Sequence, residues 1–120
     1  MQRYELEAWL GDDHGLDDLG LANLLTVANE IEDRYPDPDD HAERDAALTA
    51  AYRLITEPAQ VVVSNYSEQR ASALAAASAA TAALQQAARN PVVFDRLSEA
   101  GFARAAGVDR MTVRKWRDKR

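Results

Sequence analysis

The sequence predicts an all-α fold for this chain of 120 residues, and three observations support the prediction. Apolar residues recur at steps of three and four along most of the chain, which is the spacing of one face of an α-helix. Prolines fall between the periodic segments, where they end one helix and allow the next to begin. Residues 71–88 also contain 11 alanines, and alanine has the highest helix propensity of all residues.

The first third of the chain contains one short ambiguous segment and two periodic ones. Residues 4–10 alternate partly as a strand does and also suit a short helix, and a turn at residues 11–15 ends them. From Asp17, a predicted N-cap, helical spacing continues to Tyr35, just before Pro36. Residues 37–40 offer a cap and a negative first turn for a second helix that ends near Ile55. The predicted apolar faces are formed by Leu21, Leu24, Leu25, Ala28 and Ile31, and by Ala47, Leu48, Ala51 and Tyr52.

Residues 59–89 predict a long alanine-rich helix that follows Pro58 and ends before Pro91. At about 1.5 Å per residue this segment spans roughly 46 Å, more than the width of a domain of this size. Val61–Val63 alone would also suit a strand. Because alanine buries little area, such a helix gains stability by close packing, either along residues 17–55 or against a second copy of the chain. Its apolar stripe consists of Val62, Tyr66, Ala73, Ala77, Ala80, Leu84 and Ala88.

Charge is distributed unevenly along the chain, whose net charge is −6. Residues 101–120 hold seven basic and two acidic residues, a net charge of +5, whereas residues 1–100 carry −11. An acidic body with a basic end suggests that only the end binds a polyanion. Twelve of the 14 basic residues are arginine, a bias that we interpret as codon usage in a GC-rich bacterial genome.

Composition also excludes several classes of protein. The absence of cysteine excludes disulfides, cysteine-ligated zinc and thiol catalysis, and is compatible with a reducing cytosol. No apolar run approaches the roughly 18–20 residues that cross a bilayer. The first residues include acids where a signal peptide needs an apolar stretch. We therefore expect a cytoplasmic protein with no membrane segment.

The most specific pattern lies in residues 99–118. Ala103 is a small residue of the kind needed where one helix closely crosses another, and Gly107 suits a turn that requires a positive φ. Ser98 and Asp109 are placed to cap the two helices. The other predicted core positions are Phe102, Ala106, Val108, Val113 and Trp116.

This pattern resembles the helix-turn-helix of bacterial DNA-binding proteins, among them phage repressors and transcription regulators. The resemblance covers about 20 of the 120 residues. Gly101 departs from it by lying inside the first helix, which it should weaken by about 1 kcal/mol relative to alanine. Because so short a pair does not fold alone, residues 91–97 or the end of the alanine-rich helix must brace it.

The resemblance implies that the helix from Arg110 to Lys119 reads the major groove of DNA. We predict that Arg110, Arg114 and Arg117, spaced i, i+4 and i+7, share its exposed face, since arginine bonds O6 and N7 of guanine together. Lys115, Lys119 and Arg120 lie on the flank and at the end of this helix, where contacts with DNA phosphates are expected. Trp116 is predicted to belong to the core. The alternative is a solvated basic face whose cations match the helix dipole. The predicted DNA-binding residues are Arg110, Met111, Thr112, Arg114, Lys115, Arg117, Lys119 and Arg120.

Two acidic turns place possible metal ligands close together in sequence, at residues 12–14 and 37–41. Neither has the spacing of a calcium loop or of a zinc-binding helix, so we interpret both as capped turns. The two histidines are accompanied by no nucleophile elbow and no glycine-rich phosphate loop. We therefore expect no metal, no cofactor and no enzymatic activity.

The sequence as a whole predicts a small sequence-specific DNA-binding protein, most simply a transcriptional regulator. Residues 1–90 form the predicted acidic body, which dimerises, and residues 91–120 the DNA-binding region. A dimer is expected because two half-sites about 34 Å apart give the affinity that one reading helix lacks. One alternative is an accessory protein of plasmid partition, plasmid transfer or phage packaging. Another is a helical protein–protein adaptor whose basic end binds an acidic partner.

Overall fold

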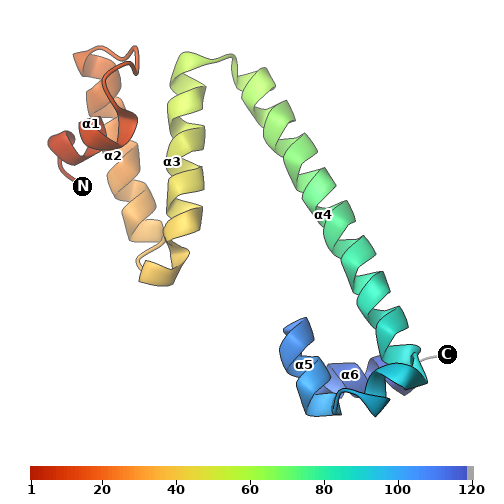
Figure 1. Cartoon of the computed structure of the whole chain (residues 1–120). Coiled ribbons are helices and arrows are strands. Elements are labelled where there is room, and N and C mark those ends of the chain that lie inside the picture. Colours follow the sequence, from red (N-terminus) through yellow and green to blue (C-terminus); the bar gives the residue numbers. More distant parts are fainter. Residues whose placement is uncertain (119–120) are drawn as a thin grey trace. The chain divides into compact units, whose positions relative to one another are not determined.

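The computed structural model describes residues 1–118, and within them the chain forms six α-helices, two short 3₁₀ helices and no strand (Figure 1). The all-α prediction is confirmed, and residues 4–10 and 61–63, which also suited strands, are helical. The helices are α1 (Arg3–Leu10), α2 (Asp18–Arg34), η1 (Pro38–Asp40), α3 (His41–Thr56), α4 (Ala59–Arg89), η2 (Pro91–Asp95), α5 (Glu99–Ala106) and α6 (Arg110–Asp118).

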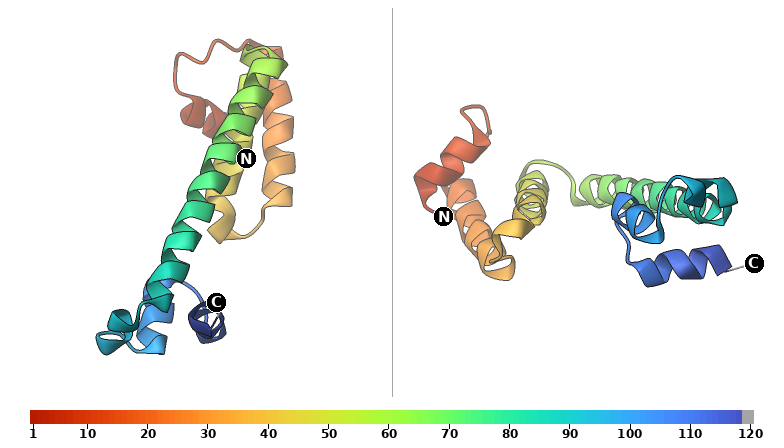
Figure 2. Two further views of the ribbon diagram at one scale, coloured as in Figure 1. Left: turned by 90° about the vertical axis from the view of Figure 1, so that its right-hand side faces the viewer. Right: turned by 60° about the horizontal axis from the view of Figure 1, so that its bottom comes forward.

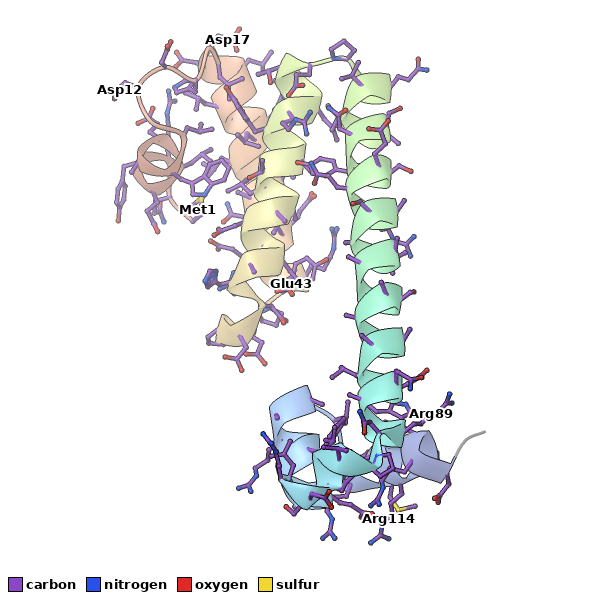
Figure 3. All side chains as sticks on the ribbon, turned by 45° about the vertical axis from the view of Figure 1, so that its right-hand side comes forward. Met1, Asp12, Asp17, Glu43, Arg89 and Arg114 are labelled. Carbon is purple, nitrogen blue, oxygen red and sulfur yellow. The ribbon has the colours of Figure 1, made fainter. Side chains whose placement is uncertain are left out.

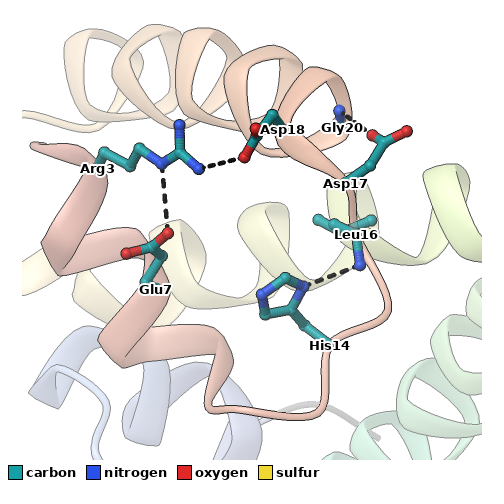
Figure 4. Close-up of polar contacts among 7 residues, drawn as sticks. All are labelled: Arg3, Glu7, His14, Leu16, Asp17, Asp18 and Gly20. Atoms are coloured by element: carbon teal, nitrogen blue, oxygen red, sulfur yellow. Dashed lines mark hydrogen bonds and ion pairs between the residues drawn. The ribbon is translucent and has the colours of Figure 1, made fainter.

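Polar contacts fix the start of α2 and join it to α1 (Figure 4). The Asp17 carboxylate accepts a hydrogen bond from the Gly20 amide at 2.7 Å, as predicted for an N-cap. Arg3 donates from Nη2 to Asp18 at 2.7 Å and from Nε to Glu7 at 3.2 Å. Both pairs are exposed and add little stability, and the Arg3–Asp18 pair is the one that joins the two helices.

Helices α1, α2 and α3 enclose an aliphatic core. Leu6 and Leu24 are completely buried there, and the two periodic faces predicted from the sequence supply every buried residue except Leu6. Such burial is the main source of stability for helices of this length. The buried members are Leu6, Leu21, Leu24, Ala28, Ile31 and Leu48.

The two acidic turns use their polar groups to hold their own backbone. The Asp37 carboxylate accepts a hydrogen bond from the Asp39 amide at 2.9 Å, and Nδ1 of His14 accepts one from the Leu16 amide at 2.9 Å (Figure 4). Across residues 1–118, no three histidine or carboxylate side chains converge as a metal site would require. In the same residues, no helix combines the length and the apolar character that crossing a bilayer demands.

Helix α4 has buried residues near both of its ends and is exposed to solvent between them. Val62 is 2 % exposed, and the Arg53 guanidinium lies 5.1 Å from the centre of the Tyr66 ring. Every residue from 67 to 83 is exposed, and half of the Leu74 surface remains accessible. The stripe is covered again at Leu84, which is half-buried, and at Ala88, which is buried. Packing against α3 therefore accounts for the first turns of α4 only.

The chain divides into two compact units, residues 1–67 and residues 68–120, which we call the N-terminal and C-terminal units. The division falls inside α4 and not at the predicted boundary of residues 90 and 91. The reason is that Ala88 belongs to the same core as Phe102 and Val113, so the second part of α4 is a structural element of the C-terminal unit. Figure 2 gives two further views of the helices of each unit.

Candidate nucleic-acid interface

Helices α5 and α6 are joined by a tight turn at Gly107, as the sequence predicted. Gly107 has a φ of 71°, in the left-handed region. Among the described residues, none beyond its chain neighbours comes within 4 Å of an added Cβ, so backbone conformation rather than space requires glycine here. The Val108 amide donates to the Ala103 carbonyl at 3.0 Å and the Gly107 amide to the Arg104 carbonyl at 3.3 Å. These two bonds form a Schellman motif, which ends α5 sharply.

Both helices of the pair begin at side-chain caps, and both caps were predicted. Ser98 Oγ accepts a hydrogen bond from the Gly101 amide at 3.0 Å, and Asp109 Oδ1 accepts one from the Thr112 amide at 2.7 Å. The bond from Thr112 is the main cause that lowers the pKa of Asp109, which therefore caps α6 as a carboxylate at neutral pH. The ends of the pair are thus fixed by local hydrogen bonds.

A small core holds the helix pair against the end of α4 and against η2. The rings of Phe94 and Phe102 stack with centroids 5.6 Å apart. Ala106, Val108 and Trp116 are half-buried at the edge of this core, so every predicted core residue except the exposed Gly107 packs into it. Both braces proposed from the sequence, residues 91–97 and the end of α4, contribute. The buried members are Ala88, Phe102, Ala103 and Val113.

The outward face of α6 carries four exposed side chains on adjacent turns, Arg110, Met111, Arg114 and Lys115. Figure 3 labels Arg114 on this face and Arg89 at the end of α4. Thr112 is half-buried, and its amide is used by the Asp109 cap. The predicted contacts of Lys119 and Arg120 lie outside the described residues.

Glu99 pairs with two of the arginines that were predicted to face DNA. Its Oε2 lies 3.0 Å from Nε of Arg114, and its Oε1 lies 2.7 Å from Nη1 of Arg117. The Arg117 guanidinium also lies 3.9 Å from the centre of the Phe94 ring, a cation–π contact. Arg117 is exposed, as predicted, but its guanidinium is already engaged by Glu99 and by the Phe94 ring.

The electrostatics of Glu99 follow from these contacts. The hydrogen bond from Arg114 is the largest cause that lowers the pKa of Glu99, and the contact with Arg117 lowers it further. The carboxylate is consequently ionised throughout the neutral range. Its side chain is 23 % exposed, whereas that of Arg114 is 54 % exposed, so Glu99 is the more covered partner of the pair.

Sequence reasoning missed four contributors to this region. Glu99 and the Arg89 Nε, which donates to the Trp116 carbonyl at 3.3 Å, act on residues at least 15 positions away. Gln85 of α4 and Asp118 of α6 were missed as well, because they line one hollow only after folding. Those residues line an open hollow beside the basic face: Gln85, Met111, Arg114, Lys115, Trp116 and Asp118.

The arrangement can bind an anionic surface, since guanidinium and ammonium groups project from one face of a helix whose start is capped. Arginine can in addition distinguish base edges by paired hydrogen bonds. Comparison of the chain with protein-family models, with curated proteins and with solved structures finds no match.

Proposed function

We propose that this chain is a sequence-specific binder of double-stranded DNA that regulates transcription, with α6 as its reading helix. The observation that carries the proposal is the exposed basic face of α6, formed by Arg110, Met111, Arg114 and Lys115 on a helix whose start is capped. An α-helix fits the major groove, where two arginines can each recognise a guanine and the Met111 side chain can contact a thymine methyl group.

The distribution of charge over the two units supports the same function. Residues 68–120 hold ten basic and five acidic residues, whereas residues 1–67 hold four basic and fifteen acidic ones. A polyanion is therefore attracted to one unit and repelled by the other. Binding that depends on phosphate contacts should weaken steeply with salt, by a log–log slope of about −0.9 for each phosphate neutralised.

Selection from a pool of duplexes with a randomised centre, followed by fluorescence anisotropy at several salt concentrations, tests this proposal with the full chain. Arg110→Ala and Arg114→Ala should each weaken binding to the selected duplex by about 1–3 kcal/mol and relax one base position. Lys119→Ala should weaken all sequences alike. Arg70→Ala, an exposed arginine of α4, removes the same charge as a matched control. Unchanged binding by a combined Arg110, Arg114 and Arg117 alanine variant would refute the assignment of α6.

We further propose that the chain acts as a dimer whose second copy covers the bare part of α4. Residues 71–88 carry no charge, and the stripe that is buried at Val62 and at Ala88 is exposed between them at Ala73, Ala77 and Ala80. Small side chains allow the backbones of two such helices to approach closely. A dimer would also set two reading helices on half-sites one turn of DNA apart, about 34 Å.

Glutamate at both Ala77 and Ala80 should abolish the dimer and leave helicity largely intact, as measured by analytical ultracentrifugation and circular dichroism. The matched control is glutamate at both Ala75 and Ala79, which lie on the other side of α4. Equal loss of dimer in both variants would show that the seam is not this stripe. A parent chain that remains monomeric at micromolar concentration, with and without its DNA, would refute the dimer.

The two alternatives from the sequence lead to different results in the same experiments. An accessory protein would bind the selected DNA, but its sites in sheared genomic DNA would cluster at a partition, transfer or packaging locus instead of at promoters. An adaptor would enrich no duplex; the hollow beside Trp116, with Arg114 and Lys115 at its rim, would then suit an acidic peptide.

A further inference from the structure

We infer that Glu99 is a positioning residue that holds Arg114 ready to read a guanine, an inference that rests on the proposed DNA binding. The geometry of the pair is the first support. Arg114 gives its Nε to the Glu99 carboxylate at 3.0 Å. Within the described residues, neither terminal nitrogen of Arg114 has a hydrogen-bond partner, and these two nitrogens are the pair that recognises O6 and N7 of guanine.

The contrast between Arg114 and Arg117 is the second support. Arg117 donates a hydrogen bond from its terminal Nη1 to Oε1 of Glu99 at 2.7 Å. Its guanidinium carbon also lies 3.9 Å from the centre of the Phe94 ring. It therefore binds one oxygen of the carboxylate, while Arg114 binds the other. The three side chains form a chain of contacts, in which Arg117 orients the Glu99 carboxylate and the carboxylate orients the Arg114 guanidinium.

The position of Glu99 in the chain keeps the carboxylate in place. It is the first residue of α5, next to the Ser98 cap, where the positive end of the helix dipole favours an anion. Its side chain is largely covered, and its hydrogen bonds keep it ionised at neutral pH. A movement of the Glu99 carboxylate away from this position would break its bond to Arg117 and take it away from the N-terminus of α5.

Two physical effects then favour specific over nonspecific DNA. A long arginine side chain loses rotational freedom when it binds, and an arginine already held in one orientation loses less. The carboxylate also offsets the attraction of Arg114 and Arg117 for phosphates, which are present at every sequence. Glu99 should thus strengthen recognition of one guanine while weakening indiscriminate binding.

The test compares Glu99→Gln with the full parent chain on the duplex selected from a randomised pool and on a scrambled duplex of the same length, both at 150 mM salt. We expect Glu99→Gln to lower the ratio of the two affinities about tenfold and to relax the preference for guanine at the base pair where Arg114→Ala relaxes it. Binding to the scrambled duplex should be unchanged or stronger. Glu68→Gln, an exposed glutamate of α4, removes the same charge as a matched control and should change neither value.

Two further variants separate positioning from a structural role. In the Arg114→Ala background, Glu99→Gln should have no additional effect on base preference, because its target is gone. Arg117→Gln removes one of the two contacts that hold Glu99 and leaves its pair with Arg114, so it should lower the guanine preference, but less than Glu99→Gln does. Retained preference in Glu99→Gln, or an equal effect in both backgrounds, would overturn the inference while leaving DNA binding intact. Enrichment of no duplex by the parent chain would overturn the proposed function, and the inference with it.

Discussion

The N-terminal and C-terminal units stabilise their helices by different means. The N-terminal unit buries five long aliphatic side chains and one alanine in its core, with Val62 buried separately, and its helices gain stability mainly from that core. Up to residue 118, the C-terminal unit buries only one aromatic residue, one valine and two alanines, and it adds two helix caps, a Schellman turn and the Glu99 contacts. A unit specified by local hydrogen bonds can leave the outer face of a helix free for charged residues.

The largest expected losses of stability come from replacing a large buried side chain by alanine in each of the two cores. Phe102→Ala should destabilise the C-terminal unit by about 3–5 kcal/mol, and Leu24→Ala should destabilise the N-terminal unit by about 2–5 kcal/mol, since both side chains are buried. Hydrogen exchange along the chain in increasing urea measures each unit separately. Loss of protection in both units with either variant would show that they unfold together.

Replacing Gly107 tests the turn on which the C-terminal unit depends. Gly107→Ala should cost about 1–2 kcal/mol, because an L-residue is strained at a φ of 71° even with open space around it. Gly107→Asn should cost less, since asparagine tolerates this conformation better. Thermal unfolding measures both, and equal stability of the alanine variant and the parent would contradict the strain argument.

The caps offer a matched pair across the two units. Asp17→Ala and Asp109→Ala should each cost about 1 kcal/mol, because each removes one hydrogen bond to a helix N-terminus. The loss should lower the melting temperature of the C-terminal unit more, since its core is smaller. Asp109→Asn keeps the acceptor and should restore most of the stability; a failure to do so would assign the effect to charge and not to the cap.

Acid should act on both units through different carboxylates, and its effect should be the smallest. The folded-state pKa values of Glu99 and Asp109 are lowered by their hydrogen bonds, and that of Glu57 is lowered by Arg53. A lowered pKa means that the folded state binds fewer protons, so the stabilisation is complete above the ordinary pKa, near 4, and is lost as pH falls through the folded value. Urea unfolding between pH 7 and pH 3 should show this decline.

Variants separate the acid response of the two units. Glu99→Gln and Asp109→Asn together should flatten the pH dependence of the C-terminal unit and leave that of the N-terminal unit unchanged. Glu57→Gln should do the converse. A decline that persists unaltered in the C-terminal unit would show that other carboxylates govern it.

Features set by neighbouring residues could be predicted from the sequence. Asp17, Ser98 and Asp109 were identifiable as caps because a cap bonds an amide only three residues away. Gly107 was identifiable because few residues other than glycine suit a turn with positive φ. Helical periodicity likewise identified every residue of the aliphatic core except Leu6, whose segment was too short to show a period.

Features that depend on distant residues could not be predicted. Glu99 forms ion pairs with Arg114 and Arg117, which are 15 and 18 positions away. No pattern in the sequence indicates which of several arginines will pair with a given carboxylate. The boundary between the compact units differs from the predicted boundary for a related reason. Alanine at position 88 looks like its neighbours in sequence, and only its contact with Phe102 and Val113 assigns it to the C-terminal unit.

The bare middle of α4 has a consequence for the order in which the chain folds. Starting a helix is costly, with a nucleation constant of about 10⁻³, whereas extending one through alanine is close to neutral or favourable. Val62 is buried near the start of α4 and Ala88 near its end, so the helix can be nucleated at either end. Residues 67–83 then become helical by propagation from either side, and formation of one core lowers the entropic barrier to ordering the segment that leads to the other.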